Sequence, residues 1–136
     1  MNDLIAFIRA RIDEDERTAR RAADVYDGAT TWELTRATAM DVGERTFIAE
    51  IGADEDGFRP SELDHIARHD PARVLREVEA KRRILDEYRA AQANLKQHPD
   101  DLAGKGWLLG TVRVINLLAL PYADHPDYRP EWAVAA

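Results

Sequence analysis

Apolar residues recur at helical spacing along most of the chain, and this pattern predicts three to four helices. We expect the first over residues 2–23, a short one over 62–69, the longest over 71–97 and the most apolar over 107–120. The stripe of the first helix consists of Leu4, Ile5, Ile8 and Ile12. Ser61 and Asp64 approximate a capping box at the start of the short helix.

The period of the pattern changes to two between residues 32 and 51, which indicates strands. Trp32 and Leu34 alternate with polar residues, and residues 47–51 do the same after the turn-forming 41-DVGE-44. A β-hairpin near 32–51 is our interpretation, and a continuous helix over 33–40 is the alternative, because several of those residues favour helices. The predicted fold class is therefore mainly α (α+β), in a single domain over 1–136.

The segment 65-HIARHDPARVL-75 contains the candidate metal ligands. His65 and His69 are four residues apart, so they lie on one side of a helix and could share a divalent transition metal ion. Asp70 and His125 could complete the set, with Glu62, Asp124 or Asp127 as further donors. The alternative, which we favour, is a structural role: the segment is a joint, where one helix ends and the next begins. Pro71 disfavours helical geometry at Asp70, and an Asp-Pro pair is typical of a helix start. His69 would then interact with the dipole at the end of the preceding helix.

The long predicted helix has an apolar stripe that could meet another chain. At 1.5 Å per residue this helix is about 40 Å long, which is more than a compact domain of this size covers. We therefore expect a homodimer, with part of the helix packed on a second copy. The expected interface residues are Val74, Val78, Leu85, Tyr88 and Leu95. Lys81 and Gln92 interrupt this stripe.

Residues 107–120 are too apolar all round for a helix with one solvated face. Such a helix either runs through the core or has its second side covered by another chain. The tail 121-PYADHPDYRPEW-132 carries three prolines and several aromatic residues. These aromatics could frame a small pocket, but aromatics in such a tail more commonly pin it to the body by burying a large area.

Composition and charge limit which classes of function the protein can have. The chain has 136 residues, 45% of them hydrophobic, and its net charge is −7. This charge disfavours non-specific nucleic-acid binding, and acidic residues neutralise the basic segment from Arg68 to Arg83; a nucleic-acid regulator is the least favoured alternative. The absence of cysteine excludes disulfides, thiolate zinc sites and cysteine nucleophiles. We expect a cytoplasmic protein, because the sequence shows no recognisable signal peptide. We expect no membrane partner, because the apolar run 107–120 is too short to span a bilayer.

The sequence contains no pattern that identifies a catalytic residue. The single serine, Ser61, is explained by helix capping, and Gly104 and Gly106 lack the residues of a phosphate-binding loop. The acidic loop 54-DEDG-57 lacks the spacing of a calcium loop. We therefore expect a non-enzymatic protein without a required cofactor.

Three blocks resemble an uncharacterised family of small actinobacterial and actinophage proteins. They are 4-LIAFIRARIDEDE-16, 65-HIARHDPARVLREVEAKRRIL-85 and 117-LLALPYADHPDYRPEW-132. The resemblance implies a phage-associated or actinobacterial protein and supplies no activity or catalytic residue. With the patterns above, it leads us to expect a small adaptor protein that self-associates through its long helix and binds an as yet unidentified protein partner. A metal-binding module, with a metal-dependent hydrolase as one form of it, is the alternative.

Overall fold

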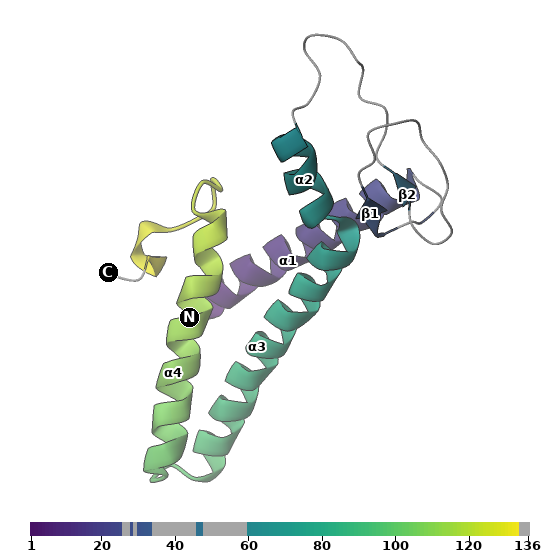
Figure 1. Ribbon diagram of the computed structural model, residues 1–136. Helices are drawn as coiled ribbons and strands as arrows, with labels where there is room; N and C mark the ends of the chain where they lie inside the picture. The colour runs from purple at the N-terminus through teal and green to yellow at the C-terminus, as the bar shows by residue number, and fades with distance from the viewer. Residues whose placement is uncertain (26–27, 29, 34–45, 48–59, 134–136) are drawn as a thin grey trace. The chain divides into compact units, whose positions relative to one another are not determined.

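The protein is helical in the part that the structure describes. The computed structural model describes residues 1–25, 28, 30–33, 46–47 and 60–133. Its helices are α1 (Asn2–Asp24), α2 (Pro60–Arg68), α3 (Pro71–Gln97) and α4 (Leu102–Ala119), followed by the short 3-10 turns η1 (Leu120–Tyr122) and η2 (Pro130–Trp132) (Figure 1). The prediction of a mainly helical fold is confirmed, and the long helix has the predicted bounds.

The predicted β-hairpin is wrong for the described residues. β1 (Trp32–Glu33) and β2 (Thr46–Phe47) pair in parallel, with Trp32 opposite Thr46, whereas the strands of a hairpin are antiparallel. The rest of the predicted hairpin, 34–45 and 48–51, lies outside the described residues. Alternation of apolar and polar residues indicates which side chains share a face, but it carries no information on the direction of the partner strand.

The chain forms two compact units. Unit 1 comprises Met1–Asp13 and Val78–Ala136, and unit 2 comprises Glu14–Glu77. The expectation of a single domain stays a prediction.

The core of unit 1 is built by three helices that each contribute one apolar stripe. From α1 the side chains of Leu4, Ile8 and Ile12 are buried at helical spacing, as the sequence predicts. α3 contributes Val78, Leu85 and Tyr88, and α4 contributes Ile115 and Ala119, all at most 5% exposed. Fully burying one such large aliphatic side chain contributes about 1.5–3 kcal/mol, so these stripes supply much of the stability of the unit.

The connection between α3 and α4 depends on Asp101. Its Oδ1 accepts a hydrogen bond from the backbone N–H of Ala103 at 3.0 Å, and its Oδ2 accepts one from the side chain of Asn94 at 3.1 Å. A hydrogen bond from the backbone N–H of Gly104, together with those from Asn94 and Ala103 and the charge of His98, holds the pKa of Asp101 below its usual value of 3.8. Asp101 is thus the N-cap of α4, and the helix begins five residues before the predicted start at residue 107.

The tail after α4 folds onto the first half of α1. The Phe7 ring lies 5.0 Å from the ring of Trp132 and 6.1 Å from that of Tyr128, measured between centroids. Tyr122 accepts a 2.7 Å hydrogen bond from Lys81, and Arg129 forms a 3.0 Å ion pair with Asp3. The aromatic residues therefore pin the tail to the body, which is the second of the two interpretations of this segment.

Candidate functional site

Of the two histidines of the predicted metal site, His65 lies in the last turn of α2 and His69 directly follows the end of this helix, both in unit 2. Their ring centroids are 4.3 Å apart, and both side chains are exposed. The Nδ1 of His69 lies 2.9 Å from the carbonyl oxygen of His65; since a carbonyl only accepts, this nitrogen is the donor. One ring nitrogen of His69 is therefore engaged with a backbone carbonyl at the end of α2.

Asp70 acts as the start of α3. Its side chain is buried, and Oδ1 accepts a 2.7 Å hydrogen bond from the backbone N–H of Arg73. This is the geometry of a helix N-cap, and Pro71 occupies the first helical position behind it. The joint predicted from the Asp-Pro pair is confirmed.

His125, the fourth candidate ligand, lies in unit 1, where both of its ring nitrogens have neighbours. Nδ1 accepts a 3.1 Å hydrogen bond from the backbone N–H of Asp127, and Nε2 contacts the guanidinium of Arg11. Among the described residues, no group of three or more His, Asp or Glu side chains is arranged to hold a metal ion. The metal set of His65, His69, Asp70 and His125 stays a prediction.

The stripe of α3 that was expected to meet a second copy packs largely inside the chain. Val78, Leu85 and Tyr88 belong to the core of unit 1, whereas Val74 and Leu95 are half-buried. The same stripe can be covered by the chain's own helices or by another chain, and the sequence does not distinguish the two. The interface of Val74, Val78, Leu85, Tyr88 and Leu95 stays a prediction.

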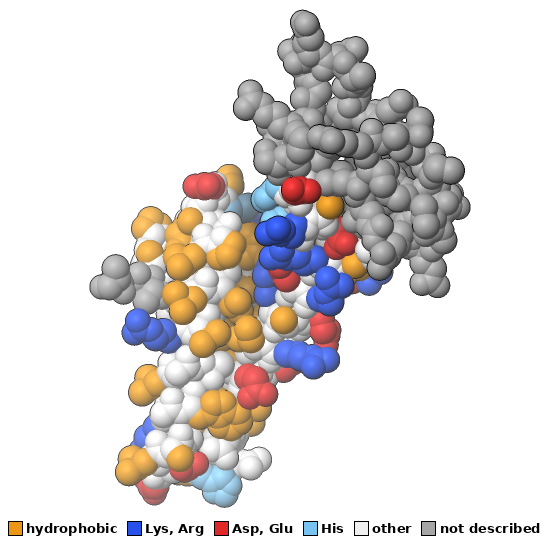
Figure 2. Space-filling model, viewed as in Figure 1, with side chains coloured by type: hydrophobic (Ala, Val, Ile, Leu, Met, Phe, Trp, Pro, Cys, Tyr) orange, Lys and Arg blue, Asp and Glu red, His pale blue; other side chains and the backbone are white. Residues whose placement is uncertain are grey.

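The exposed apolar surface of unit 1 lies instead on α4. Six large apolar side chains on this helix and its C-cap are between 40% and 80% exposed: Leu102, Trp107, Leu109, Val114, Leu117 and Leu120. We call them the outer face of α4. Figure 2 shows hydrophobic side chains gathered along α4, whereas charged side chains are concentrated along α3.

A shallow groove of about 350 Å³ runs beside Trp107 and Val114, between α3 and α4. Ile84 and Glu87 of α3 form its far wall, and its lining is mostly apolar. Gly106 and Gly110 lie at its edge, and a methyl group added at either position would meet no other atom within 4 Å. The outer face of α4 thus combines exposed apolar side chains with two glycines whose surroundings are open.

Over residues 1–134 the chain matches the model of a family of unknown function, DUF6221. The chain belongs to this family. The DUF6221 match includes all three blocks that carry the resemblance to an uncharacterised family, which confirms that resemblance to this extent. No curated protein and no solved structure matches the chain significantly.

Among the described residues, no helix combines the length and the hydrophobicity that a membrane crossing requires. This applies to α4 too, although it is the most apolar of the four helices.

Proposed function

We propose that this protein is a non-enzymatic interaction protein that forms a homodimer through the outer face of α4. The observation that carries the proposal is the exposure of six large apolar side chains, five on α4 and one at its C-cap. A contiguous apolar patch on a soluble domain typically marks a contact surface, because each Å² of apolar surface removed from water stabilises the contact by about 25 cal/mol.

Charge supports a contact centred on α4. The whole chain has a net charge of −7, so two copies repel each other on average. Within α4, however, only Lys105 and Arg113 are charged. A contact through this helix brings the apolar surfaces together and keeps most of the acidic residues outside the interface.

The shape of the face supports a second copy as the partner. In a two-fold dimer the same residues of both copies face one another, so the surface must be complementary to itself. The outer face offers both elements of such a fit: Trp107 is partly exposed, and the groove beside it, lined by Gly106 and Gly110, can receive Trp107 of the second copy. Glycines in helix contacts also let two backbones approach closely.

Sedimentation equilibrium with one charged substitution tests this proposal. We expect the mass of the wild-type protein to rise from 15.4 kDa toward twice that value as its concentration increases. Leu109→Glu should remain monomeric, because it buries an unpaired charge in the contact. Ala90→Glu adds the same charge at an exposed position of α3 and should associate like the wild type.

Two results would refute the dimer: a wild-type protein that stays monomeric at every concentration, or a Leu109→Glu variant that associates as strongly as Ala90→Glu. Circular dichroism of both variants checks that their helices are retained. A monomeric wild type that is captured by a different protein through the same face would replace the homodimer by the predicted heterologous partner.

A further inference from the structure

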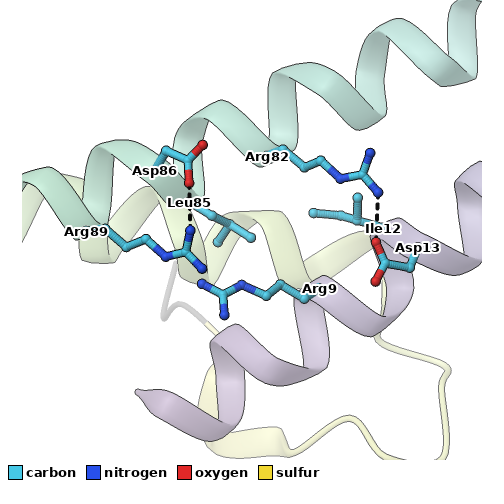
Figure 3. Close-up of a pocket in the computed structure, with 7 residues that line it drawn as sticks. All are labelled: Arg9, Ile12, Asp13, Arg82, Leu85, Asp86 and Arg89. Atoms are coloured by element: carbon cyan, nitrogen blue, oxygen red, sulfur yellow. Dashed lines mark hydrogen bonds and ion pairs between the residues drawn. The ribbon is translucent and has the colours of Figure 1, made fainter.

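A second candidate site in unit 1 lies between α1 and α3, whereas the groove described above lies between α3 and α4. There α1 and α3 enclose a hollow of about 300 Å³, which we call the arginine pocket (Figure 3). Its charged lining comprises Arg9, Arg82, Arg89, Asp13 and Asp86. We propose that the arginine pocket binds a small monocarboxylic acid that carries an apolar group.

Two of the three arginines are already neutralised within the pocket. Arg82 forms a 2.8 Å ion pair with Asp13, and Arg89 forms a 3.0 Å ion pair with Asp86. Arg9 has neither a hydrogen bond nor an ion pair with any described residue. Arginine stays protonated at all ordinary pH values, so the three arginines and two aspartates of the lining leave one excess positive charge.

The unpaired charge of Arg9 faces a second guanidinium. In Figure 3 the side chains of Arg9 and Arg89 extend toward one another from α1 and α3. The two residues also line a neighbouring hollow of about 240 Å³, so they stand at the boundary between the two spaces. Like charges in this arrangement repel, and an anion between them replaces that repulsion by two charge-assisted hydrogen bonds.

The charge balance favours a carboxylate over a phosphate. A carboxylate carries one negative charge, which matches the single excess positive charge, and its two oxygens suit the planar fork of a guanidinium. A phosphate monoester carries a charge of about −1.5 to −2 at neutral pH. Its additional charge would face Asp13 and Asp86 at the rim of the same pocket.

The floor of the pocket accounts for the apolar group. Ile12 and Leu85 line it, and both belong to the core of unit 1. A ring or short alkyl chain can rest on these two side chains while its carboxylate reaches the arginines. The volume lies at the lower end of the range of small-molecule sites, about 300–1,000 Å³, so the ligand must be small.

Benzoate is a suitable probe, with benzamide as its neutral counterpart of the same shape. We expect an NMR titration of the full chain with benzoate to shift the Nε–H signals of Arg9 and Arg89 and the methyl signals of Ile12 and Leu85. The expected dissociation constant is about 1 mM, because the ligand is small and the pocket is open to solvent. Benzamide should cause no saturable shift.

Substitution of the unpaired arginine provides the matched comparison. Arg9→Gln should weaken benzoate binding by about tenfold or more, which corresponds to about 1.4 kcal/mol. Arg17→Gln removes the same charge from an exposed position on α1 outside the pocket and should leave the affinity unchanged.

Four outcomes would overturn this proposal. The first two are no benzoate binding and equal binding of benzamide. The other two are tighter binding of inorganic phosphate and equal loss of affinity in the Arg9→Gln and Arg17→Gln variants. The pocket is lined by α1 and α3 only, so these results are independent of whether α4 forms a dimer contact.

Discussion

Gly104 is a position where contacts with neighbouring side chains leave no room for a residue larger than glycine. It is buried near the start of α4, where a methyl group would lie 2.6 Å from the side-chain nitrogen of Asn94 and 2.7 Å from Oδ2 of Asp101. A larger side chain must therefore push apart the two groups that cap the helix. The helix predicted from sequence begins only at residue 107, after Gly104, and the contact that makes Gly104 necessary is invisible in the local pattern.

A matched pair of glycine substitutions tests this requirement. Gly106→Ala should stabilise monomeric protein by up to about 1 kcal/mol through helix propensity, since its surroundings are open. Gly104→Ala gains the same propensity but displaces Asn94 and Asp101, so we expect a net loss of stability. Urea denaturation of both variants in the Leu109→Glu background measures the difference. Equal effects of the two substitutions would contradict the role assigned to Gly104.

The lowered pKa of Asp101 gives a pH-dependent prediction. Because the folded pKa lies below the usual 3.8, the ionised cap stabilises the fold fully above that value. This stabilisation is lost as the pH falls through the still lower folded pKa. The difference in Tm between the wild type and Asp101→Asn should therefore be larger at pH 7 than at strongly acidic pH. A difference that does not change across this range would show that the charge of Asp101 is irrelevant to the cap.

At the scale of elements, α3 was predictable because its ends are set locally. Asp70-Pro71 begins it, and it ends just before His98-Pro99. The direction of pairing between β1 and β2 and the partner of the α3 stripe depend on residues far away in sequence. The stripe through Leu85 was therefore read correctly as an apolar face of α3, but the pattern did not specify its tertiary partner.

Leu85 and Leu109 both lie in apolar stretches of helix, but they should differ sharply in their contribution to the free energy of unfolding. Leu85→Ala removes a side chain that is 3% exposed and should lower the free energy of unfolding by about 2–5 kcal/mol. Leu109→Ala removes one that is 70% exposed and should change the stability of the monomer by less than about 0.5 kcal/mol. Chemical denaturation at low protein concentration distinguishes the two. A small effect at Leu85 would place that residue outside the core.

At the scale of the whole molecule, the sequence predicted an apolar contact surface on the long helix, and this stays a prediction, whereas the exposed apolar side chains of unit 1 lie mainly on α4. The all-round apolar character of residues 107–120 predicted either a core position or cover by another chain, and the exposed outer face of α4 is consistent with the second. The arginine pocket was missed altogether. Arg9 lies on α1, whereas Arg82 and Arg89 lie on α3, and no spacing rule connects residues more than seventy positions apart.

The most direct test of the central proposal is an isotope-filtered NMR experiment on a mixture of labelled and unlabelled wild-type protein. Intermolecular NOEs in this mixture arise only where two copies touch. We predict that they connect the methyl groups of Leu109, Val114 and Leu117 with protons of the second copy, including the Trp107 ring. Intermolecular NOEs confined to residues outside α4, or none at concentrations where the protein is dimeric by mass, would contradict the proposal.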